Sequence, residues 1–170
     1  TAIASATITQ PAVLVATAGN NGPVCEGSSL SLTGGPNGMS IYSWTGPNGY
    51  TSLLQNPVVS PNATLAMAGV YTLTVTDALG CTGSANTNVT IIPANTINLT
   101  SGAGTNNQTV CINTAITNIT YATTGATGAN VTGLPAGVNG NWAANVVTIS
   151  GTPLVSGTFN YTVTLTGGCG

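Results

Sequence analysis

The sequence contains no lysine, arginine or histidine, and its only side-chain carboxylates are those of Glu26 and Asp77. Proteins that bind nucleic acids draw most of their affinity from Lys and Arg side chains that neutralise phosphates. Attraction to anionic lipid headgroups uses the same cations. The longest apolar stretch, near residues 12–18, is shorter than the roughly 20 residues that span a bilayer. We therefore expect no nucleic-acid partner and no direct membrane insertion.

The chain has few side chains of the types that enzymes use for catalysis. General acid-base and nucleophilic mechanisms need His, Lys, paired carboxylates or an activated thiol in one site. Glu26 stands beside Cys25 in an expected loop, and Asp77 stands at the end of an expected strand, where an Asx turn is the ordinary role. We expect that the chain is not an enzyme, that it uses no cofactor or metal, and that these two residues have turn and surface roles.

Sustained apolar patterns with helical spacing are also missing, whereas short runs rich in Val, Ile, Thr, Tyr and Leu recur between Gly, Pro and Asn. A formal charge of only −2 with moderate hydrophobicity indicates a folded chain. The predicted class is therefore all-β. The expected strands are 12–17, 28–33, 39–44, 70–77, 85–92, 96–101, 115–123, 145–150 and 159–166.

Two similar stretches show that the chain contains a repeat: GVYTLTVTDALGC at 69–81 and GTFNYTVTLTGGC at 157–169. The period of 86 to 88 residues fits one small β-sandwich per repeat. We predict two tandem sandwich domains, residues 12–93 and 94–170, with residues 1–11 as the tail of a preceding repeat or a leading strand. Because TAIASATITQP lacks the features of a signal peptide, we expect a piece of a longer, processed protein.

Side chains alternate between the two faces of a strand, so each copy of the repeated stretch has one apolar face and one Thr-rich or Asn-rich face. The apolar face is expected to lie in the core of its domain. The predicted core residues are Trp44, Tyr71, Leu73, Val75, Phe159, Tyr161 and Val163.

Four cysteines permit three disulfide pairings, and the repeat favours one of them. We predict Cys25 with Cys81 and Cys111 with Cys169, each pair within one copy. A shared metal site or a reactive thiol is the rival interpretation, but the chain has no His, no CxxC pair and no cation that lowers a thiol pKa. Four buried free thiols would leave the mirrored spacing unexplained. Disulfides imply an oxidising, extracellular or periplasmic location.

Two aromatic residues are candidates for ligand contact, because exposed aromatic rings stack on sugars. Trp142 stands between turn residues in GNWAAN, and Tyr50 follows GPNG. Core packing is the competing interpretation for both rings.

The stretch MAGVYTLTVTD resembles the tyrosine-corner region of immunoglobulin-like and PKD-like domains, and Trp44 resembles their buried core Trp. Leu73 stands where immunoglobulin domains have their second Cys, so the resemblance implies a bridge nearer the sandwich end. GLPAGV at 133–138 with ISGTPLVSGTFNYTVT at 149–164 resembles the putative-Ig and cadherin-like repeats of bacterial surface proteins. With two carboxylates, the calcium sites of true cadherins do not carry over.

The combination of VCEGSSLSLT, YSWTGPNGY and YTLTVTDALGCT resembles repeats of very large secreted surface proteins of Bacteroidota. These include gliding-motility adhesins and other cargo of the type IX secretion system. The resemblance implies a structural repeat segment of a cell-surface adhesin or filament, which extends and presents a binding region. Neighbouring repeats of the same chain or filament are its expected partners.

Two other functions stay open. The first is a carbohydrate-binding or accessory module of a secreted enzyme, with surface polysaccharide as the partner and an exposed Trp142 in its favour. The second is a self-assembling filament subunit, in which an edge strand of one copy pairs with its neighbour.

Overall fold

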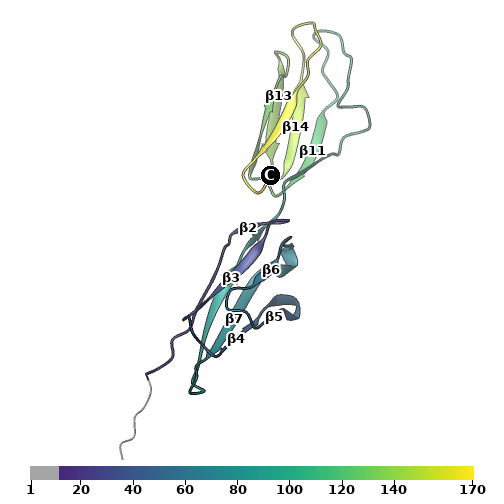
Figure 1. Cartoon of the computed structure of the whole chain (residues 1–170). Coiled ribbons are helices and arrows are strands. Elements are labelled where there is room, and N and C mark those ends of the chain that lie inside the picture. The colour runs from purple at the N-terminus through teal and green to yellow at the C-terminus, as the bar shows by residue number, and fades with distance from the viewer. Residues whose placement is uncertain (1–11) are drawn as a thin grey trace, which may run out of the picture. The chain divides into compact units, whose positions relative to one another are not determined.

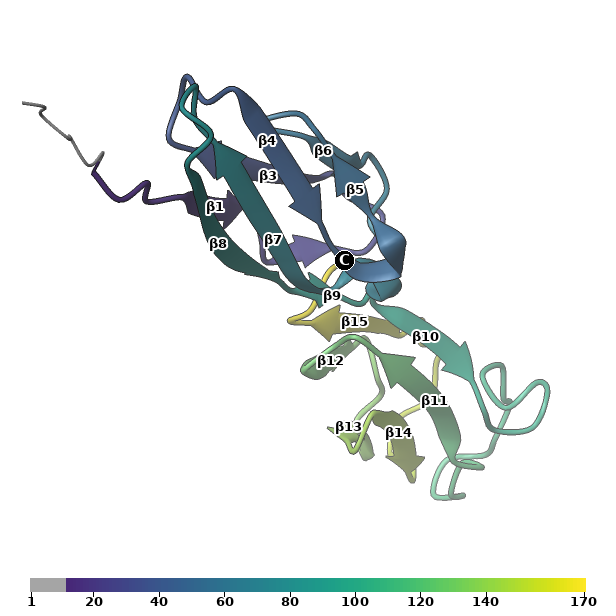
Figure 2. The ribbon, with the colours of Figure 1, turned by 90° about the horizontal axis from the view of Figure 1, so that it is seen from below.

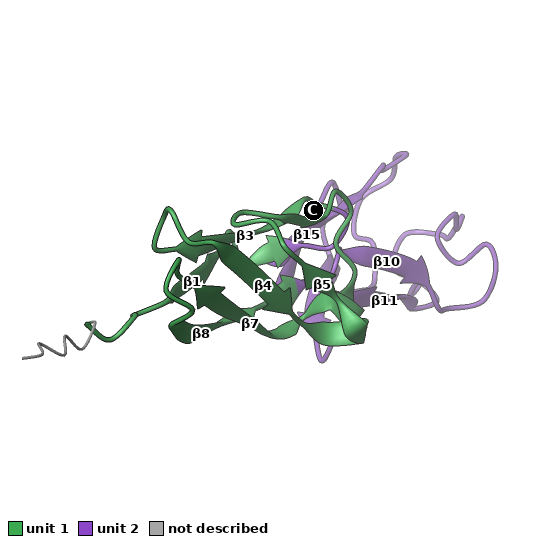
Figure 3. Cartoon of the chain, turned by 60° about the horizontal axis from the view of Figure 1, so that its bottom comes forward, with its two compact units in different colours: residues 1–24, 28–91 green, residues 25–27, 92–170 purple. Residues whose placement is uncertain are grey.

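The computed structural model describes residues 12–170, and nearly all of its regular structure is β-strand. The chain divides into two compact units. Of the described residues, 12–24 and 28–91 form unit 1, and Cys25–Gly27 with Ile92–Gly170 form unit 2 (Figure 3). The all-β class predicted from the sequence is confirmed. The interpretation of residues 1–11 as part of a preceding repeat concerns residues outside those described.

Unit 1 contains two antiparallel sheets, ordered β1-β3-β6 and β5-β4-β7-β8 (Figures 1 and 2). Its elements are β1 (Thr17–Asn20), β3 (Leu30–Gly35), β4 (Ile41–Thr45), η1 (Pro47–Gly49), β5 (Thr51–Ser52), β6 (Val58–Ser60), η2 (Leu65–Met67), β7 (Gly69–Thr76) and β8 (Thr82–Val89). The Pro, Asn and Gly residues between these runs form the turns, as their conformational preferences predict. The strand predicted at 12–17 lies later, at β1.

Two further strands, β2 (Val24–Cys25) and β9 (Ile91–Ile92), form a two-stranded sheet. The N–H of Val24 donates to the carbonyl of Thr90 at 3.0 Å, and the N–H of Glu26 donates to the carbonyl of Ile92 at 2.8 Å. Because β9 directly follows β8, the segment β8–β9 pairs first with β7 and then with β2.

The alternation predicted for the repeated stretch organises the core of unit 1. Tyr71, Leu73 and Val75 on β7 and Trp44 on β4 are all 0% exposed. The indole N–H of Trp44 donates to the carbonyl of Gln55 at 3.2 Å, so burial leaves its polar group paired. Fully burying side chains of this size stabilises a fold by about 1.5–3 kcal/mol each.

The tyrosine-corner hydrogen bond is present in unit 1. The hydroxyl of Tyr71 donates to the carbonyl of Met67, four residues upstream, at 3.0 Å. Burial, together with the nearby Tyr50, raises the pKa of Tyr71. This bond fixes the start of β7 against η2.

Unit 2 contains a four-stranded sheet ordered β10-β11-β14-β13 and a two-stranded sheet of β12 and β15. Its strands are β10 (Thr96–Leu99), β11 (Ile119–Thr124), β12 (Gly128–Thr132), β13 (Val138–Ala143), β14 (Val146–Gly151) and β15 (Thr162–Thr166). The buried core is small and comes from the larger sheet: Ile119, Val138, Val147 and Ile149.

The second copy of the repeated stretch is less buried than the sequence predicts. Phe159 is 41% exposed, so its assignment to the core is wrong. Tyr161 and Val163 are half-buried and pack against the core. The physical reason is that β15 begins only at Thr162 and, within the described residues 12–170, pairs with β12 alone.

The predicted disulfide pairing is also wrong, because the structure joins Cys25 to Cys169, with a Cα to Cα distance of 5.6 Å. Cys25 lies at the Ile92 end of the segment β8–β9, whereas Cys81 precedes its first residue, Thr82. At about 3.3 Å per residue, these ends are roughly 30 Å apart, whereas a disulfide needs Cα atoms within about 7 Å. The mirrored spacing of the cysteines in the two copies therefore does not show which of them face each other.

The predicted disulfide between Cys111 and Cys169 is wrong for the same reason, because the two residues lie at opposite ends of a strand. The backbone of Cys169 forms an isolated parallel β-bridge with Ala94, which precedes β10. The carbonyl of Cys169 accepts the N–H of Asn95 at 2.7 Å. Cys111 follows the opposite end of β10. Cys81 and Cys111 are free thiols in this structure, half-buried and exposed respectively.

Candidate functional site

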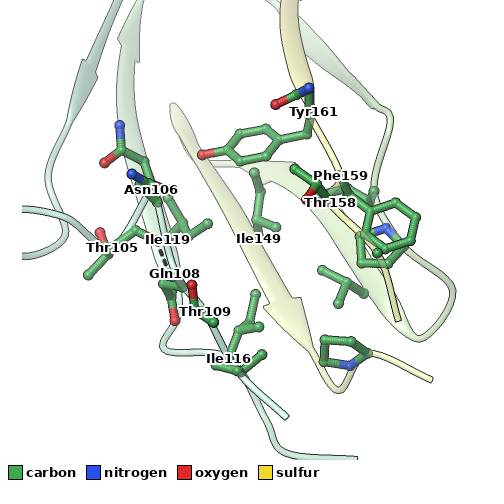
Figure 4. A pocket seen from close by; sticks show the side chains of 18 of the residues that line it. Thr105, Asn106, Gln108, Thr109, Ile116, Ile119, Ile149, Thr158, Phe159 and Tyr161 are labelled. Atoms are coloured by element: carbon green, nitrogen blue, oxygen red, sulfur yellow. Dashed lines mark hydrogen bonds between the residues drawn. The ribbon is translucent and has the colours of Figure 1, made fainter. Parts of the chain in front are cut away.

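A groove of about 650 Å³ opens in unit 2 between two segments that are distant in the sequence (Figure 4). One wall is the long connection between β10 and β11, and the other is the segment that leads into β15. The lining residues used below are Gln108, Thr109, Val110, Ile119, Tyr121, Ile149, Phe159 and Tyr161.

The floor of the groove is the apolar face of the larger sheet. Ile119 on β11 is 5% exposed and Ile149 on β14 is 0% exposed, and the two residues are register partners. Figure 4 shows both side chains between the two walls. The groove therefore leads directly to the hydrophobic core of unit 2.

The first wall is held in place by one amide side chain. Nε2 of Gln108 donates to the carbonyls of Thr105 and Thr117, both at 2.6 Å. Oε1 of Gln108 accepts the N–H of Thr117 at 2.8 Å. These three bonds fix an irregular connection, because they satisfy backbone groups that no sheet pairs.

The second wall presents aromatic residues. The hydroxyl of Tyr161 lies 2.7 Å from that of Tyr121 on β11, and Phe159 is partly exposed. Burial and the hydrogen bond with Tyr121 raise the pKa of Tyr161 well above its usual range. The hydroxyl of Tyr161 is therefore neutral at physiological pH, and the residues that line the groove carry no charge. Such a surface suits apolar groups and neutral hydrogen-bonding groups, including the edge of a polypeptide strand.

The two aromatic residues predicted to contact a ligand do not line this groove. Trp142 on β13 is half-buried against the core of unit 2, and its indole N–H donates to Oγ1 of Thr123 at 3.0 Å. Tyr50 is half-buried in unit 1, with its ring edge-on to Tyr71 at a centroid distance of 5.6 Å. These contacts give both rings a packing role.

The two carboxylates occupy separate surroundings. Oδ1 of Asp77 accepts the N–H groups of Leu79 and Cys81 at 2.8 and 2.9 Å, which is the turn role predicted for it. The backbone of Glu26 continues the pairing with β9. Among residues 12–170, no three His, Cys, Asp or Glu side chains gather where they could hold a metal ion. In the same part of the chain, no helix is long and apolar enough to cross a membrane.

Sequence reasoning did not identify the groove. The sequence feature that could have indicated the groove is a longer connection in the second repeat. Residues 21–29 separate β1 from β3, whereas the longer stretch 100–118 separates β10 from β11. The exposed Phe159 could not be recognised from the alternating pattern, which is the same in both copies.

Comparison with known proteins gives the fold but no family. No family model matches the chain, and no curated protein is significantly similar to it in sequence. The N-terminal eight Ig domains of Down Syndrome Cell Adhesion Molecule isoform 1.30.30 match with a TM-score of 0.57 at 9% identity, over 84% of this chain and 25% of that chain. The chain therefore has an immunoglobulin-like fold.

Two other solved structures match the chain with lower TM-scores. Murine CEACAM1b matches with a TM-score of 0.42 at 13% identity, over 87% of this chain and 90% of that chain. The amphioxus IgVJ-C2 molecule matches with a TM-score of 0.37 at 22% identity, over 46% of this chain and 44% of that chain. The chain thus spans less than half of the amphioxus molecule and a quarter of the eight-domain molecule.

Proposed function

We propose that the chain is a structural repeat segment of an extracellular adhesin or surface filament, which extends and presents a binding region. The observation that carries the proposal is the disulfide between Cys25 and Cys169, which are 144 residues apart in the sequence. Its presence suits an oxidising, extracellular location. The immunoglobulin-like fold supports a module that extends or binds rather than one that catalyses.

The disulfide determines how the chain responds to tension. A force that enters along the backbone before Cys25 and leaves after Cys169 passes through the sulfur atoms, so it bypasses all residues between them. The segment then keeps its length under load even when individual strands open. That property is useful in a stalk or filament.

The resemblance of the sequence to surface proteins of Bacteroidota supports a finer proposal. We infer that the parent protein belongs with very large secreted adhesins such as those used in gliding motility. Neighbouring repeats are its proposed partners.

Single-molecule force spectroscopy, with handles at the two ends of the chain, tests the mechanical proposal. In the oxidised chain, pulling should not extend the residues between the two cysteines. Reduction should release roughly 500 Å of contour length, since an extended residue spans about 3.3–3.6 Å. The variant with Cys81→Ser and Cys111→Ser keeps the disulfide and should behave as the oxidised wild type. An oxidised chain that unravels to the same length as the reduced chain would refute the proposal.

A further inference from the structure

The strand β6 of unit 1 is paired on one side. It pairs with β3, and within residues 12–170 no strand pairs with its second side. The larger sheet of unit 2 has the corresponding order β10-β11-β14, and there β13 pairs with the second side of β14 and packs Trp142 against the core. Among the described residues, unit 1 thus has no counterpart of β13. The N–H and C=O groups along the second side of β6 form an open edge, which is a template for another strand.

A hollow of about 210 Å³ lies beside this edge in unit 1. It is lined by residues of β6 and β7, of η1 and η2, and of the start of β5: Pro47, Asn48, Tyr50, Val59, Met67 and Tyr71. The amide of Asn48 already donates to the carbonyl of Ala66 at 2.7 Å, and the other lining residues are apolar or aromatic. An apolar cavity of about 150 Å³ can hold a benzene molecule. The hollow therefore has room for a branched aliphatic side chain.

The chain exposes such side chains next to the same edge. Leu53 is 75% exposed, Leu54 is 66% exposed and Val58 is 62% exposed. The two leucines belong to the segment that joins β5 to β6, and Figures 1 and 2 show these strands beside each other. Neighbouring apolar side chains that remain in contact with water mark a contact surface.

Hydrogen bonds hold the segment that carries the leucines. The carbonyl of Gln55 accepts the indole N–H of Trp44, and Nε2 of Gln55 donates to the carbonyl of Gly34 at 2.8 Å. Oδ1 of Asn56 accepts the N–H of Gly34 at 3.0 Å. The leucines therefore project from an ordered loop, so a partner that buries them loses little free energy to ordering.

The absence of charge indicates which partner suits this edge. Residues 47–71, which include the hollow, the leucines and β6, contain no Asp, Glu, Lys, Arg or His. A protein of ordinary composition has about a quarter of its residues charged, and it would lose the hydration of those charges here without gaining a counter-charge. A second copy of this chain brings only Glu26 and Asp77, and its own leucines match the hollow.

We propose that two copies of this chain join through β6, which pairs antiparallel with β6 of the second copy about a twofold axis. Val59 lies opposite Val59 of the second copy, and Val58 lies opposite Ser60. Antiparallel pairing brings the residues before Val58 of one copy beside those after Ser60 of the other, which lead to η2 and the hollow. Leu53 and Leu54 of each copy thereby fill the hollow of the other. This inference goes beyond the proposed function and does not rest on it.

The association state tests the proposal directly. The variant with Cys81→Ser and Cys111→Ser serves as the parent, because it has no free thiol with which to link copies. In sedimentation equilibrium its mass should rise with concentration to that of two copies and no further, since a twofold contact is closed. A mass that stays at one copy at about 1 mM, where even weak contacts populate dimers, would overturn the proposal.

A matched pair of double variants locates the contact. Leu53→Asp with Leu54→Asp places carboxylates in the apolar hollow and should weaken association by at least about a hundredfold. Val13→Asp with Leu79→Asp adds the same charge to unit 1 at two side chains that are 88% and 76% exposed, and it should associate within a few-fold of the parent. All four side chains are exposed in the single copy, so the urea midpoints of both variants should match that of the parent. Association that persists in the first variant, or that falls equally in both, would show that another surface joins the copies.

Cross-linking tests the antiparallel register. Chains with Val58→Cys are mixed with chains with Ser60→Cys, because the proposed pairing places these positions opposite each other with Cβ atoms about 4.5–5.5 Å apart, close to disulfide distance. Oxidised glutathione takes up the two protons and two electrons of the two thiols and becomes two molecules of reduced glutathione. Links between unlike variants should predominate, whereas equal amounts of like and unlike links would contradict the register. Failure of these tests would leave the force response of the single chain unchanged, so the two proposals are tested separately.

Discussion

The two units carry the same alternating strand but bury it differently. On β7, Tyr71, Leu73 and Val75 are all 0% exposed, whereas in unit 2 Phe159 is 41% exposed and Tyr161 and Val163 are half-buried. In each of the two strands, the apolar side chains alternate with polar ones and lie on the less exposed face. The difference comes from the neighbouring strands, because among residues 12–170 β7 pairs with β4 and β8, whereas β15 pairs with β12 alone. An alternating pattern thus shows which face is apolar, and the adjoining strands decide whether that face is buried.

Removal of the disulfide should produce the largest difference in stability between the two units, because both of its cysteines belong to unit 2. Replacing Cys25 and Cys169 by Ser should lower the unfolding free energy of unit 2 by about 2–5 kcal/mol and that of unit 1 by less than about 1 kcal/mol. Urea unfolding followed by Trp fluorescence can separate the units, since Trp44 lies in unit 1 and Trp142 in unit 2.

The matched control for this experiment is the replacement of the free cysteines, Cys81 and Cys111, by Ser. Neither unit should change by more than about 0.5 kcal/mol, as is usual for positions outside the core. An equal loss of stability in both units upon removal of the disulfide would show that unit 2 does not depend on it more than unit 1.

The next comparison concerns the equivalent aromatic residues. Tyr71→Ala should destabilise unit 1 by about 3–5 kcal/mol, because it leaves a cavity in a closed core and removes the bond to Met67. Phe159→Ala should destabilise unit 2 by only about 1 kcal/mol, because much of the ring is in contact with water. Chemical denaturation of both variants measures the difference. Similar losses would show that Phe159 packs as tightly as Tyr71.

These results also explain what the sequence could predict. Alternation in GVYTLTVT and the turn residues around it predicted the strand β7 and its buried face, and Trp44 was recognised by its resemblance to a core Trp. Phe159 and the disulfide partners were not predicted correctly, because both depend on which strands adjoin in space. Cys25 and Cys81 have suitable spacing in the sequence, yet the segment β8–β9 separates them.

A smaller difference lies in the turns that follow the two equivalent strands. Oδ1 of Asp77 accepts two backbone N–H groups after β7, whereas the chain after β15 passes through Gly167 and Gly168, with φ of 71° and 63°. Asp77→Ala should cost unit 1 about 1–2 kcal/mol, because both donors lose their partner. Asp77→Asn keeps an acceptor at this position and should cost less than about 0.5 kcal/mol. An equally large loss in both variants would mean that charge, rather than the two hydrogen bonds, stabilises the turn.

The smallest expected effect is that of pH, which should be nearly absent over the neutral range. Burial raises the pKa of both Tyr71 and Tyr161, so each folded unit holds its phenolic proton more tightly than the unfolded chain does. The resulting stability is fully present below the unfolded value of about 10 and is lost as the pH rises above it. Without Lys, Arg or His, few other groups titrate at neutral pH. Urea midpoints should therefore be flat between about pH 6 and 9 and should fall above about pH 10. Tyr161→Phe should reduce the fall in unit 2 and leave unit 1 unchanged, whereas an equal alkaline fall in this variant and the wild type would place the titrating group elsewhere.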